Sequence, residues 1–314
     1  VKESVEPKET GQPKDLKVKE QDTPKITKGK DGRKTLLFKG LAETFDKLEN
    51  EPGRINKGNI MAKYLELVLR ENPADLADVL NLTTGQVAPT WEGKELGIGD
   101  QILKSVVQQV TGLKATQLND KIKEMGDIGI VAQRTKQNQR LLAKPQPLTI
   151  HGVITTMLEI LNSENTEMKK KKITSLLVAA VGPEIRFILR ILKGVFRIGF
   201  SERSLPVPLA TAICAVRERK PETEALAELI KSAIARVPSF EVLSESLVAE
   251  DPFEALKHAC SIHLFTPFKP QLAKPKKAIT DITGKFGFPF TAEYKYDGER
   301  GQIHYSKKGV KVFT

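Results

Sequence analysis

Apolar residues recur at a helical spacing through most of the chain between residues 35 and 266. A repeat of three to four residues puts apolar side chains on one face of a helix, so this pattern predicts amphipathic α-helices. The first two faces consist of Leu37, Phe38, Leu41, Phe45 and Leu48, and of Ile60, Tyr64, Leu67 and Val68. Similar faces lie within 102–110, 150–161, 185–192 and 253–260.

Residues that favour caps and turns mark the ends of these helices. Asp100 and Thr149 are predicted N-caps, and Gly112 is a predicted stop. Pro183 suits the first turn of one helix, and Asp251, which precedes a proline, opens another. No repeat of fixed period is present, which argues against a solenoid. About a dozen helices joined by short turns predict an all-α domain of roughly 230 residues.

The pattern changes after His263. Residues 266–270 contain two prolines and are typical of a linker. Short stretches at 290–296, 301–306 and 310–313 predict strands, with Lys308-Gly309 as a turn. The predicted fold class is therefore mainly α: an all-α multi-helix domain followed by the first β-strands of an α/β domain. Roughly 48 residues are too few to complete that second core, so we expect a fragment of a longer protein.

The first 34 residues form a third part. They are rich in charge and contain no aromatic residue, so they cannot bury enough apolar surface to offset the entropy of ordering. We interpret them as a disordered basic tail. The predicted division is a tail at 1–34, a helical domain at 35–266 and the start of a second domain at 267–314.

The formal net charge of +11 makes nucleic acid a natural partner. The excess is +3 in the tail, +2 in the helical domain and +6 after residue 266, so total charge says little about the helical domain. No apolar stretch approaches the ~20 residues of a membrane span. Cys214 and Cys260 make no disulfide framework and fit a reducing compartment. The four histidines have no metal-ligand spacing, so no metal site is predicted.

A local basic cluster lies between Arg186 and Arg203, with only Glu184 and Glu202 as acidic neighbours along the chain. Glycines let backbone N–H groups approach phosphates, and arginines add positive charge, so the segment favours contact with a nucleic-acid backbone without base reading. The alternative is a solvated helix face that ends at a glycine. The candidate contacts are Arg186, Arg190, Lys193, Gly194, Arg197 and Gly199.

Two weaker basic runs are interpreted as solvated faces. The first runs through a stretch without acids, and the second lies at a predicted helix start. Their members are Arg134, Lys136, Arg140 and Lys144, and Lys169–Lys172.

The sharpest chemical feature is the run E-Y-K-Y-D-G-E-R from Glu293 to Arg300. In a strand that leads into a turn, Glu293, Lys295 and Asp297 alternate onto one face. A lysine between two carboxylates favours a site rather than a core, and a neutral lysine is a nucleophile. Gly298 lets the backbone approach a ligand, and Arg300 suits a phosphate or a sugar hydroxyl. The alternative is an exposed, charged hairpin.

The segment TAEYKYDGERGQIHY at 291–305 resembles motif I of the covalent nucleotidyltransferases, most closely that of ATP-dependent DNA ligases. FKPQLAKP at 268–275 resembles the segment that opens the adenylation domain of that family. Three upstream segments resemble the helical DNA-binding domain of eukaryotic DNA ligase I, in the family's order: GQVAPTWEGKELGIGDQILKSVVQQVTG (85–112), GDIGIVAQ (126–133) and RFILRILKGVFRIGFSE (186–202). The resemblance covers about 35–314.

This resemblance implies roles for the motif. Lys295 would attack the α-phosphorus of ATP, release pyrophosphate and become lysyl-AMP. Glu293 would help to read the adenine, Arg300 would contact the AMP, and Asp297 and Gly298 would shape the nucleotide loop. Mg²⁺ would neutralise charge on the departing pyrophosphate.

It also implies a monomer that acts on nicked double-stranded DNA in the nucleus, or otherwise in the cytosol. The family often docks on a sliding clamp through a motif in its tail, but 1–34 contains no glutamine-led motif with paired aromatics.

Two other functions fit parts of the sequence. A catalytically incomplete DNA-binding module would bind duplex DNA in a salt-dependent way and form no covalent AMP product. Another covalent nucleotidyltransferase, such as an RNA capping enzyme or an RNA ligase, would share the lysine motif. Such enzymes do not need a long helical domain, which argues against this alternative.

Overall fold

The computed structural model describes residues 26–29, 32–88, 96, 98–136, 145–259, 261, 264–270, 274–287, 289–294 and 296–314. Within them the chain forms fourteen α-helices, three short 3-10 helices and two pairs of antiparallel strands. This arrangement confirms the predicted class, a helical domain followed by a few strands. Among the described residues, no helix combines the length and the apolar character that crossing a bilayer requires.

The helices of the main body are α1 (Phe38–Asn50), α2 (Arg54–Glu71), α3 (Leu76–Thr84), α4 (Asp100–Thr111), α5 (Ala115–Met125), α6 (Ile128–Thr135), α7 (Ile150–Leu161), α8 (Thr166–Ala179), α9 (Glu184–Lys193), α10 (Pro206–Val216), α11 (Thr223–Arg236), α12 (Phe240–Val248) and α13 (Pro252–Ala259). The 3-10 helices are η1 (Pro73–Asp75), η3 (Glu202–Ser204) and η4 (Lys220–Glu222). The remaining elements are β1 (Ile26–Lys28), β2 (Lys34–Leu36), α14 (Ile279–Phe286), β3 (Gln302–Ser306) and β4 (Gly309–Phe313).

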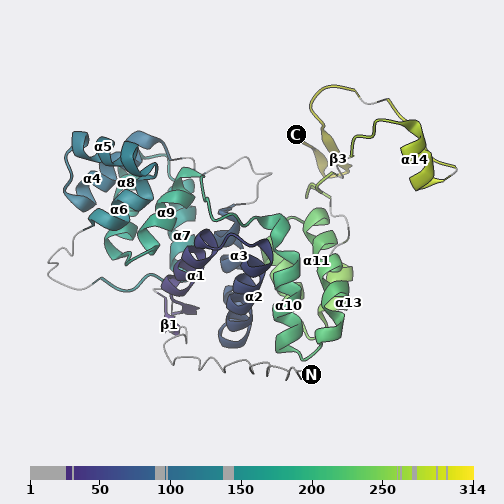
Figure 1. Cartoon of the computed structure of the whole chain (residues 1–314), viewed down its shortest axis with the longest axis horizontal. Coiled ribbons are helices and arrows are strands. Elements are labelled where there is room, and N and C mark those ends of the chain that lie inside the picture. The colour runs from purple at the N-terminus through teal and green to yellow at the C-terminus, as the bar shows by residue number, and fades with distance from the viewer. Residues whose placement is uncertain are drawn as a thin grey trace, which may run out of the picture.

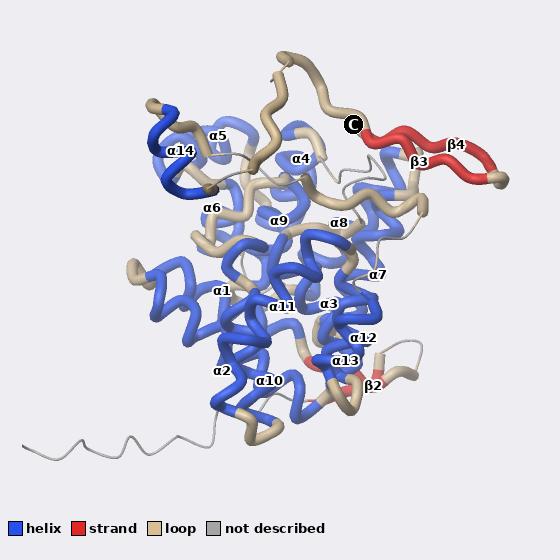
Figure 2. The backbone as a smooth tube through the Cα atoms, turned by 90° about the vertical axis from the view of Figure 1, so that its right-hand side faces the viewer, coloured by secondary structure: helices blue, strands red, loops and turns tan. Residues whose placement is uncertain are grey.

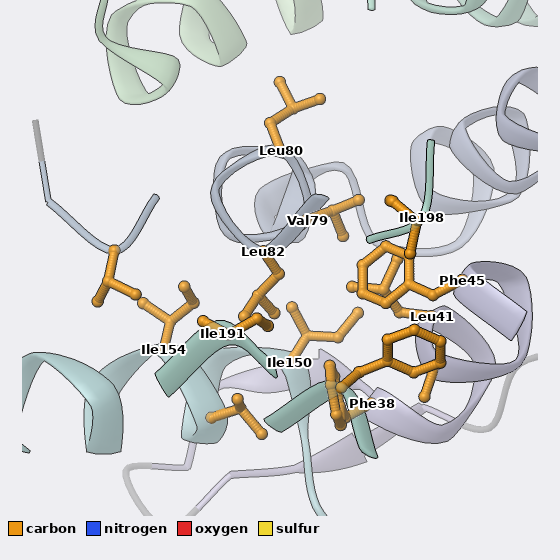
Figure 3. Packing of buried hydrophobic residues seen from close by; sticks show 14 of the residues in the cluster. Phe38, Leu41, Phe45, Val79, Leu80, Leu82, Ile150, Ile154, Ile191 and Ile198 are labelled. Carbon is orange, nitrogen blue, oxygen red and sulfur yellow. The ribbon is translucent and has the colours of Figure 1, made fainter. Parts of the chain in front are cut away.

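The helical body has two groups of helices joined through a third (Figure 1). One group consists of α4, α5, α6, α8 and α9, and the other of α2, α10, α11, α12 and α13. Helices α1, α3 and α7 contact members of both groups or link to them. A continuous hydrophobic core runs through all of these contacts, and Figure 3 shows Phe38, Leu41 and Phe45 of α1 grouped within it.

Side-chain caps explain several helix starts. The Thr149 hydroxyl accepts the Gly152 N–H at 3.0 Å, which confirms the predicted cap of α7. The prediction that Asp100 caps α4 is wrong, because the cap is Gly99 and Asp100 is the first helical residue. The preceding backbone is fixed instead by a 3.0 Å hydrogen bond from the Ile98 N–H to the Leu192 carbonyl. An acidic side chain in the first turn still favours the helix through its dipole.

Ordered backbone begins earlier than the composition predicts. Strands β1 and β2 pair across the expected boundary of the tail, with Lys28 opposite Lys34. The reason is the fully buried Asp75, whose carboxylate accepts the Leu36 N–H at 2.7 Å and the Thr35 hydroxyl at 2.9 Å. A buried carboxylate is stable only when donors satisfy its oxygens, so these two hydrogen bonds fix β2 in place. Residues 1–25 lie outside the described residues.

After residue 266 the strand predictions are partly confirmed. Strands β3 and β4 form a hairpin in which Ser306 pairs with Gly309, so the two-residue turn is Lys307-Lys308, one position before the predicted one. The strand predicted at 290–296 is absent, because residues 290–294 and 296 are neither helix nor strand. A strand needs a neighbour for its backbone hydrogen bonds, and in the described part of the chain β3 and β4 pair only with each other.

The linker connects the hairpin to the helical body (Figure 2). The Phe265 N–H donates to His304 Nδ1 at 2.9 Å, and the Phe268 N–H donates to Gln302 Oε1 at 3.2 Å. On its other side, the Lys269 N–H donates to the Ala235 carbonyl at the end of α11, at 2.7 Å.

Candidate nucleic-acid interface

The predicted basic cluster is centred on α9, which is buried from Glu184 to Leu192. This helix packs against α1, α6 and α8. A solvated helix face, the alternative interpretation of this segment, is therefore wrong. The charged side chains of α9 must find partners inside the protein, because a buried charge without a partner is strongly disfavoured.

Those partners are carboxylates from distant parts of the sequence. Arg186 is 9% exposed and forms ion pairs with Asp46 and Glu49 of α1. Arg190 is 4% exposed and donates from its two terminal nitrogens to the two oxygens of Glu49, at 2.8 and 2.9 Å. Its Nε donates to Asp127 Oδ2 at 2.9 Å. The structure thus places both arginines in an internal ion-pair network, and their contact with nucleic acid stays a prediction.

This network keeps Arg190 charged. Burial by itself would lower the pKa of the guanidinium, but the hydrogen bonds that it donates to Glu49 and the charge of Asp127 outweigh burial and raise its pKa. The ion pairs join α9 to α1 and to the start of α6, and so fix the end of α9 from which the next segment leaves.

Helix α9 ends at Gly194, which has the left-handed φ of +75°. The Val195 N–H closes this end by donating to the Arg190 carbonyl at 3.0 Å. We call residues 193–199 the basic loop. Its Phe196 ring meets the rings of Phe45 and Phe187 edge-on, with centroids 4.9 and 6.0 Å away. This aromatic contact anchors the loop to the core.

The basic loop alternates between buried and exposed side chains. Ile198 is buried, and Figure 3 shows it beside Phe45. Lys193, Val195 and Arg197 are exposed, so the loop presents two cations to solvent. Lys193 pairs with Asp100 at 2.8 Å on the surface. Arg197 donates to the Gly126 carbonyl at 3.3 Å, while 56% of its side chain stays exposed.

A cavity of about 520 Å³ adjoins the end of the basic loop. Gly199 lines it together with Arg54 and Lys57 of α2 and with Ser201 and Ser204. These side chains bring two further cations and two hydroxyls to one place, which suits binding of a phosphate backbone. Arg54 and Lys57 were missed by sequence analysis, because the fold alone brings α2 to a loop about 140 residues later.

The rim of this cavity also carries exposed apolar side chains. Ile55 of α2 is 82% exposed, and Val207 of α10 is 62% exposed. Apolar side chains beside cations occur where proteins contact the sugars and the minor groove of DNA. The arrangement therefore fits an extended polyanion with apolar faces better than a small anion.

The weaker basic run that begins at Arg134 differs from its interpretation as a solvated face. The Lys136 ammonium donates to the carbonyls of Leu177, Val178 and Ala180 at the end of α8. Burial lowers the pKa of this ammonium, although the charge of Glu184 counteracts the shift. Lys136 is thus a structural cap of α8. Arg140 and Lys144 lie outside the described residues.

The lysine motif lies in the segment that leads into β3. Its described members Glu293, Asp297, Gly298 and Arg300 are all exposed, and Gly298 has a φ of +151°. Lys295 lies outside the described residues. The roles of these residues in nucleotide binding stay predictions. Within the described residues, no three His, Cys, Asp or Glu side chains gather where they could hold a metal ion.

Comparisons with known proteins match both parts of the chain. Residues 37–210 match the family described as DNA ligase N terminus, and residues 270–314 match the ATP dependent DNA ligase domain. A protein named DNA ligase 1 from Arabidopsis thaliana is 32% identical over 289 residues, which is 88% of this chain and 36% of that protein. DNA ligase 1 of Schizosaccharomyces pombe is 31% identical over 87% of this chain and 37% of its own length.

An archaeal relative is similar at a comparable level. A protein named DNA ligase from Cenarchaeum symbiosum is 29% identical over 89% of this chain and 46% of its own length. The chain spans less than two fifths of the length of the two DNA ligase 1 relatives. Because the first family match covers more than half of the chain and the second follows it in order, the chain belongs to the ATP-dependent DNA ligase family.

Proposed function

We propose that this chain carries the DNA-binding part and the nucleophilic lysine of an ATP-dependent DNA ligase that seals nicks in duplex DNA. The run from Glu293 to Arg300 carries this proposal, because it lies inside the segment that matches the ATP dependent DNA ligase domain. The names of the relatives support it. We also propose the division into a tail at 1–34, whose last residues are ordered by the pairing of β1 with β2, a DNA-binding domain at 35–266 and the start of an adenylation domain at 267–314.

The proposed chemistry begins at Lys295. Its neutral amine attacks the α-phosphorus of ATP, and the bond to pyrophosphate breaks as the phosphoramidate of lysyl-AMP forms. The AMP then passes to the 5′-phosphate at the nick, which regenerates the lysine. Attack by the 3′-hydroxyl forms the phosphodiester bond and releases AMP. Glu293 and Arg300 are proposed to hold the nucleotide, with Asp297 and Gly298 shaping its loop.

Mg²⁺ is the proposed companion of the ATP phosphates, whose negative charge it offsets. Since no three possible ligands gather within the described residues, we assign the ion to no side chain of this chain. A metal that arrives with a nucleotide needs few protein ligands of its own.

The basic loop and the adjoining cavity are the proposed surface for the DNA backbone. Exposed Arg197 and Lys193, with Arg54 and Lys57 around the cavity, supply positive charge. Gly199 lines the same cavity, where the Lys57 ammonium takes the place that a Cβ would occupy. The buried Arg186 and Arg190 support this surface from behind through the ion-pair network. The proposed setting is a monomer in the nucleus. A sliding clamp is a partner by analogy with the family alone, since residues 1–34 contain no glutamine-led motif with paired aromatics.

Covalent labelling tests the enzymatic proposal. The full-length protein and this chain are incubated with α-labelled ATP and Mg²⁺, and the proteins are separated under denaturing conditions. We expect a labelled band from the full-length protein and no label after Lys295→Ala. Failure of the full-length protein to take up label would refute the ligase proposal, whereas label that persists in the variant would refute the assignment of Lys295.

A DNA-binding module without enzymatic activity is the second candidate, and the exposed basic loop favours it. It predicts binding to duplex DNA that weakens with salt, together with no labelled band. Binding of a nicked duplex at several salt concentrations, for the native chain and for Arg197→Ala, measures this property. Equal affinity before and after Arg197→Ala would discard the proposed phosphate contact of that side chain.

A further inference from the structure

Arg197 has a backbone conformation that L-residues rarely adopt. Its φ is +55°, in the left-handed region, where a side chain crowds the following carbonyl. Phe196 and Ile198 hold the backbone on either side. The Phe196 ring packs on aromatic neighbours, and the Ile198 side chain is buried. Strain of this kind persists only where the surroundings fix it, and it gathers at functional positions.

The guanidinium of Arg197 is held by the turn between α5 and α6. Its Nη1 donates to the Gly126 carbonyl at 3.3 Å and lies 3.8 Å from Asp127 Oδ2. Gly126 ends α5 with a φ of +69°, and Asp127 begins the next helix as its N-cap. The exposed arginine therefore rests against two consecutive residues at a rigid junction of two helices.

Asp127 is itself fixed from several directions. Its Oδ1 accepts the Gly129 N–H at 2.7 Å and the Ile130 N–H at 3.1 Å, which caps α6. Its Oδ2 accepts Arg190 Nε at 2.9 Å, and the residue is only 8% exposed. A carboxylate with this many partners has one available orientation, so the oxygen that faces Arg197 has a defined place.

That oxygen is in turn connected to α1. Glu49 holds both terminal nitrogens of Arg190, and Arg190 holds Asp127. Charges alternate along the series Glu49, Arg190, Asp127 and Arg197. Three buried or half-buried groups therefore determine where the one exposed guanidinium of the series lies.

We propose that Asp127 is a positioning residue, which presents Arg197 to the phosphate backbone of duplex DNA. The proposal rests on the proposed function, in which the basic loop contacts DNA. Holding an arginine in its binding orientation before the ligand arrives reduces the entropy lost on binding. The carboxylate contributes in this way although it repels phosphate.

The direction in which DNA affinity changes when the charge of Asp127 is removed separates positioning from an effect of summed charge. Removing a negative charge beside a DNA-binding surface tightens binding if only the summed charge matters. Removing a positioning carboxylate weakens binding, because Arg197 loses its fixed orientation. Asparagine is as good an N-cap as aspartate, so Asp127→Asn keeps the cap of α6 and removes the charge.

The experiment measures the affinity of the whole chain for a nicked duplex by fluorescence anisotropy at several salt concentrations. For Asp127→Asn we expect binding about three- to tenfold weaker than for the native chain. The salt slope falls by roughly one phosphate contact, as in Arg197→Ala. In the double variant, Asp127→Asn adds nothing to Arg197→Ala, because the effect acts through that arginine. Circular dichroism confirms that each variant is folded.

Asp100→Asn is the matched control. Asp100 lines the same crevice as Arg197, but its side chain is 62% exposed, so it does not fix Lys193 as the buried Asp127 fixes Arg197, and loss of its charge leaves binding equal or tighter. Asp127→Glu serves if the asparagine variant does not fold. It keeps the charge and displaces the carboxylate. The positioning role therefore predicts weaker DNA binding, whereas an effect of net charge alone predicts no change in affinity.

The outcomes distinguish this inference from the proposed function. Unchanged or tighter binding by Asp127→Asn, with Arg197→Ala still weakening it, would overturn the positioning role and leave the DNA contact of Arg197 intact. An Asp127→Asn effect that persists in the Arg197→Ala background would also overturn it. If the native chain shows no salt-dependent binding to duplex DNA, the DNA-binding proposal itself fails, and the inference fails with it.

Discussion

The Lys57 ammonium donates a 2.8 Å hydrogen bond to the Ile198 carbonyl and so joins α2 to the basic loop. The adjoining Gly199 has a φ of +63°, and a Cβ added there would collide with the Lys57 ammonium. The hydrogen bond between Lys57 and Ile198 thus joins the cavity to the basic loop, and it also explains why residue 199 is a glycine.

Gly199→Ala is expected to lower the free energy of unfolding more than the same substitution at an ordinary glycine of left-handed φ. The substitution strains the backbone and displaces Lys57 from the Ile198 carbonyl. Gly112→Ala is the control, because Gly112 has a φ of +74° and nothing within 4 Å of an added Cβ. We expect a loss of about 1 kcal/mol for the control and about 2 kcal/mol for Gly199→Ala, measured by urea unfolding. Equal losses would show that the lysine contact contributes nothing.

Arg190→Met is expected to destabilise the protein strongly. The substitution leaves Glu49 and Asp127 without their main partner, and breaking a buried ion pair in this way costs about 3 kcal/mol. Lys193→Met, on the surface of the same helix end, should change stability by less than about 0.5 kcal/mol. Urea unfolding of both variants checks this. A stable Arg190→Met protein with lost DNA affinity would instead identify Arg190 as a DNA contact.

This pair of arginines shows where sequence reasoning stops. The spacing of Arg186 and Arg190 marks them as a basic cluster, since the acids nearby in the sequence are few. Their partners on α1 lie 140 and 141 residues away, and no local pattern encodes such a pairing. The same limit hid Arg54 and Lys57, which only the packing of α2 brings to the basic loop.

Local signals predicted local structure well. The apolar face of Phe38, Leu41, Phe45 and Leu48 is buried in α1, and Thr149 caps α7, because both depend on residues within a few positions. The strand expected at 290–296 failed for the opposite reason. Its alternating residues suit an extended chain, but a strand exists only through pairing with another segment, which sequence spacing does not supply.

His304→Ala is expected to loosen the linker between the helical body and the hairpin. His304 Nδ1 accepts the Phe265 N–H, and its ring meets the Phe313 ring edge-on at 5.0 Å. Without the imidazole, the Phe265 amide loses its acceptor and should exchange with solvent at least several-fold faster. Amide hydrogen exchange measures this. Gln302→Ala is the control, because it should speed exchange at Phe268 and leave Phe265 unchanged; no change at either amide would contradict the docking of the linker.

The stability of the helical body should fall as pH rises from about 4.5 to about 7. Glu184 is 3% exposed, and burial raises the pKa of its carboxyl from 4.5 to about 7, although the Val181 N–H and the Lys136 ammonium counteract the shift. In this window the folded protein holds a proton that the unfolded chain has released. The free energy of unfolding therefore decreases with pH and levels off above about 7.

Glu184→Gln tests this relation, because glutamine stays neutral and can still accept the Val181 N–H. We expect similar stability to the native protein near pH 5 and greater stability at pH 8, by roughly 2 kcal/mol, from urea midpoints at four pH values. Glu167→Gln is the control, since Glu167 is exposed and its loss should leave the pH dependence unchanged. Parallel curves for Glu184→Gln and the native protein would mean that Glu184 is already ionised in the folded state. Its burial would then be offset by the ammonium of Lys136, whose three carbonyl contacts hold it beside α9.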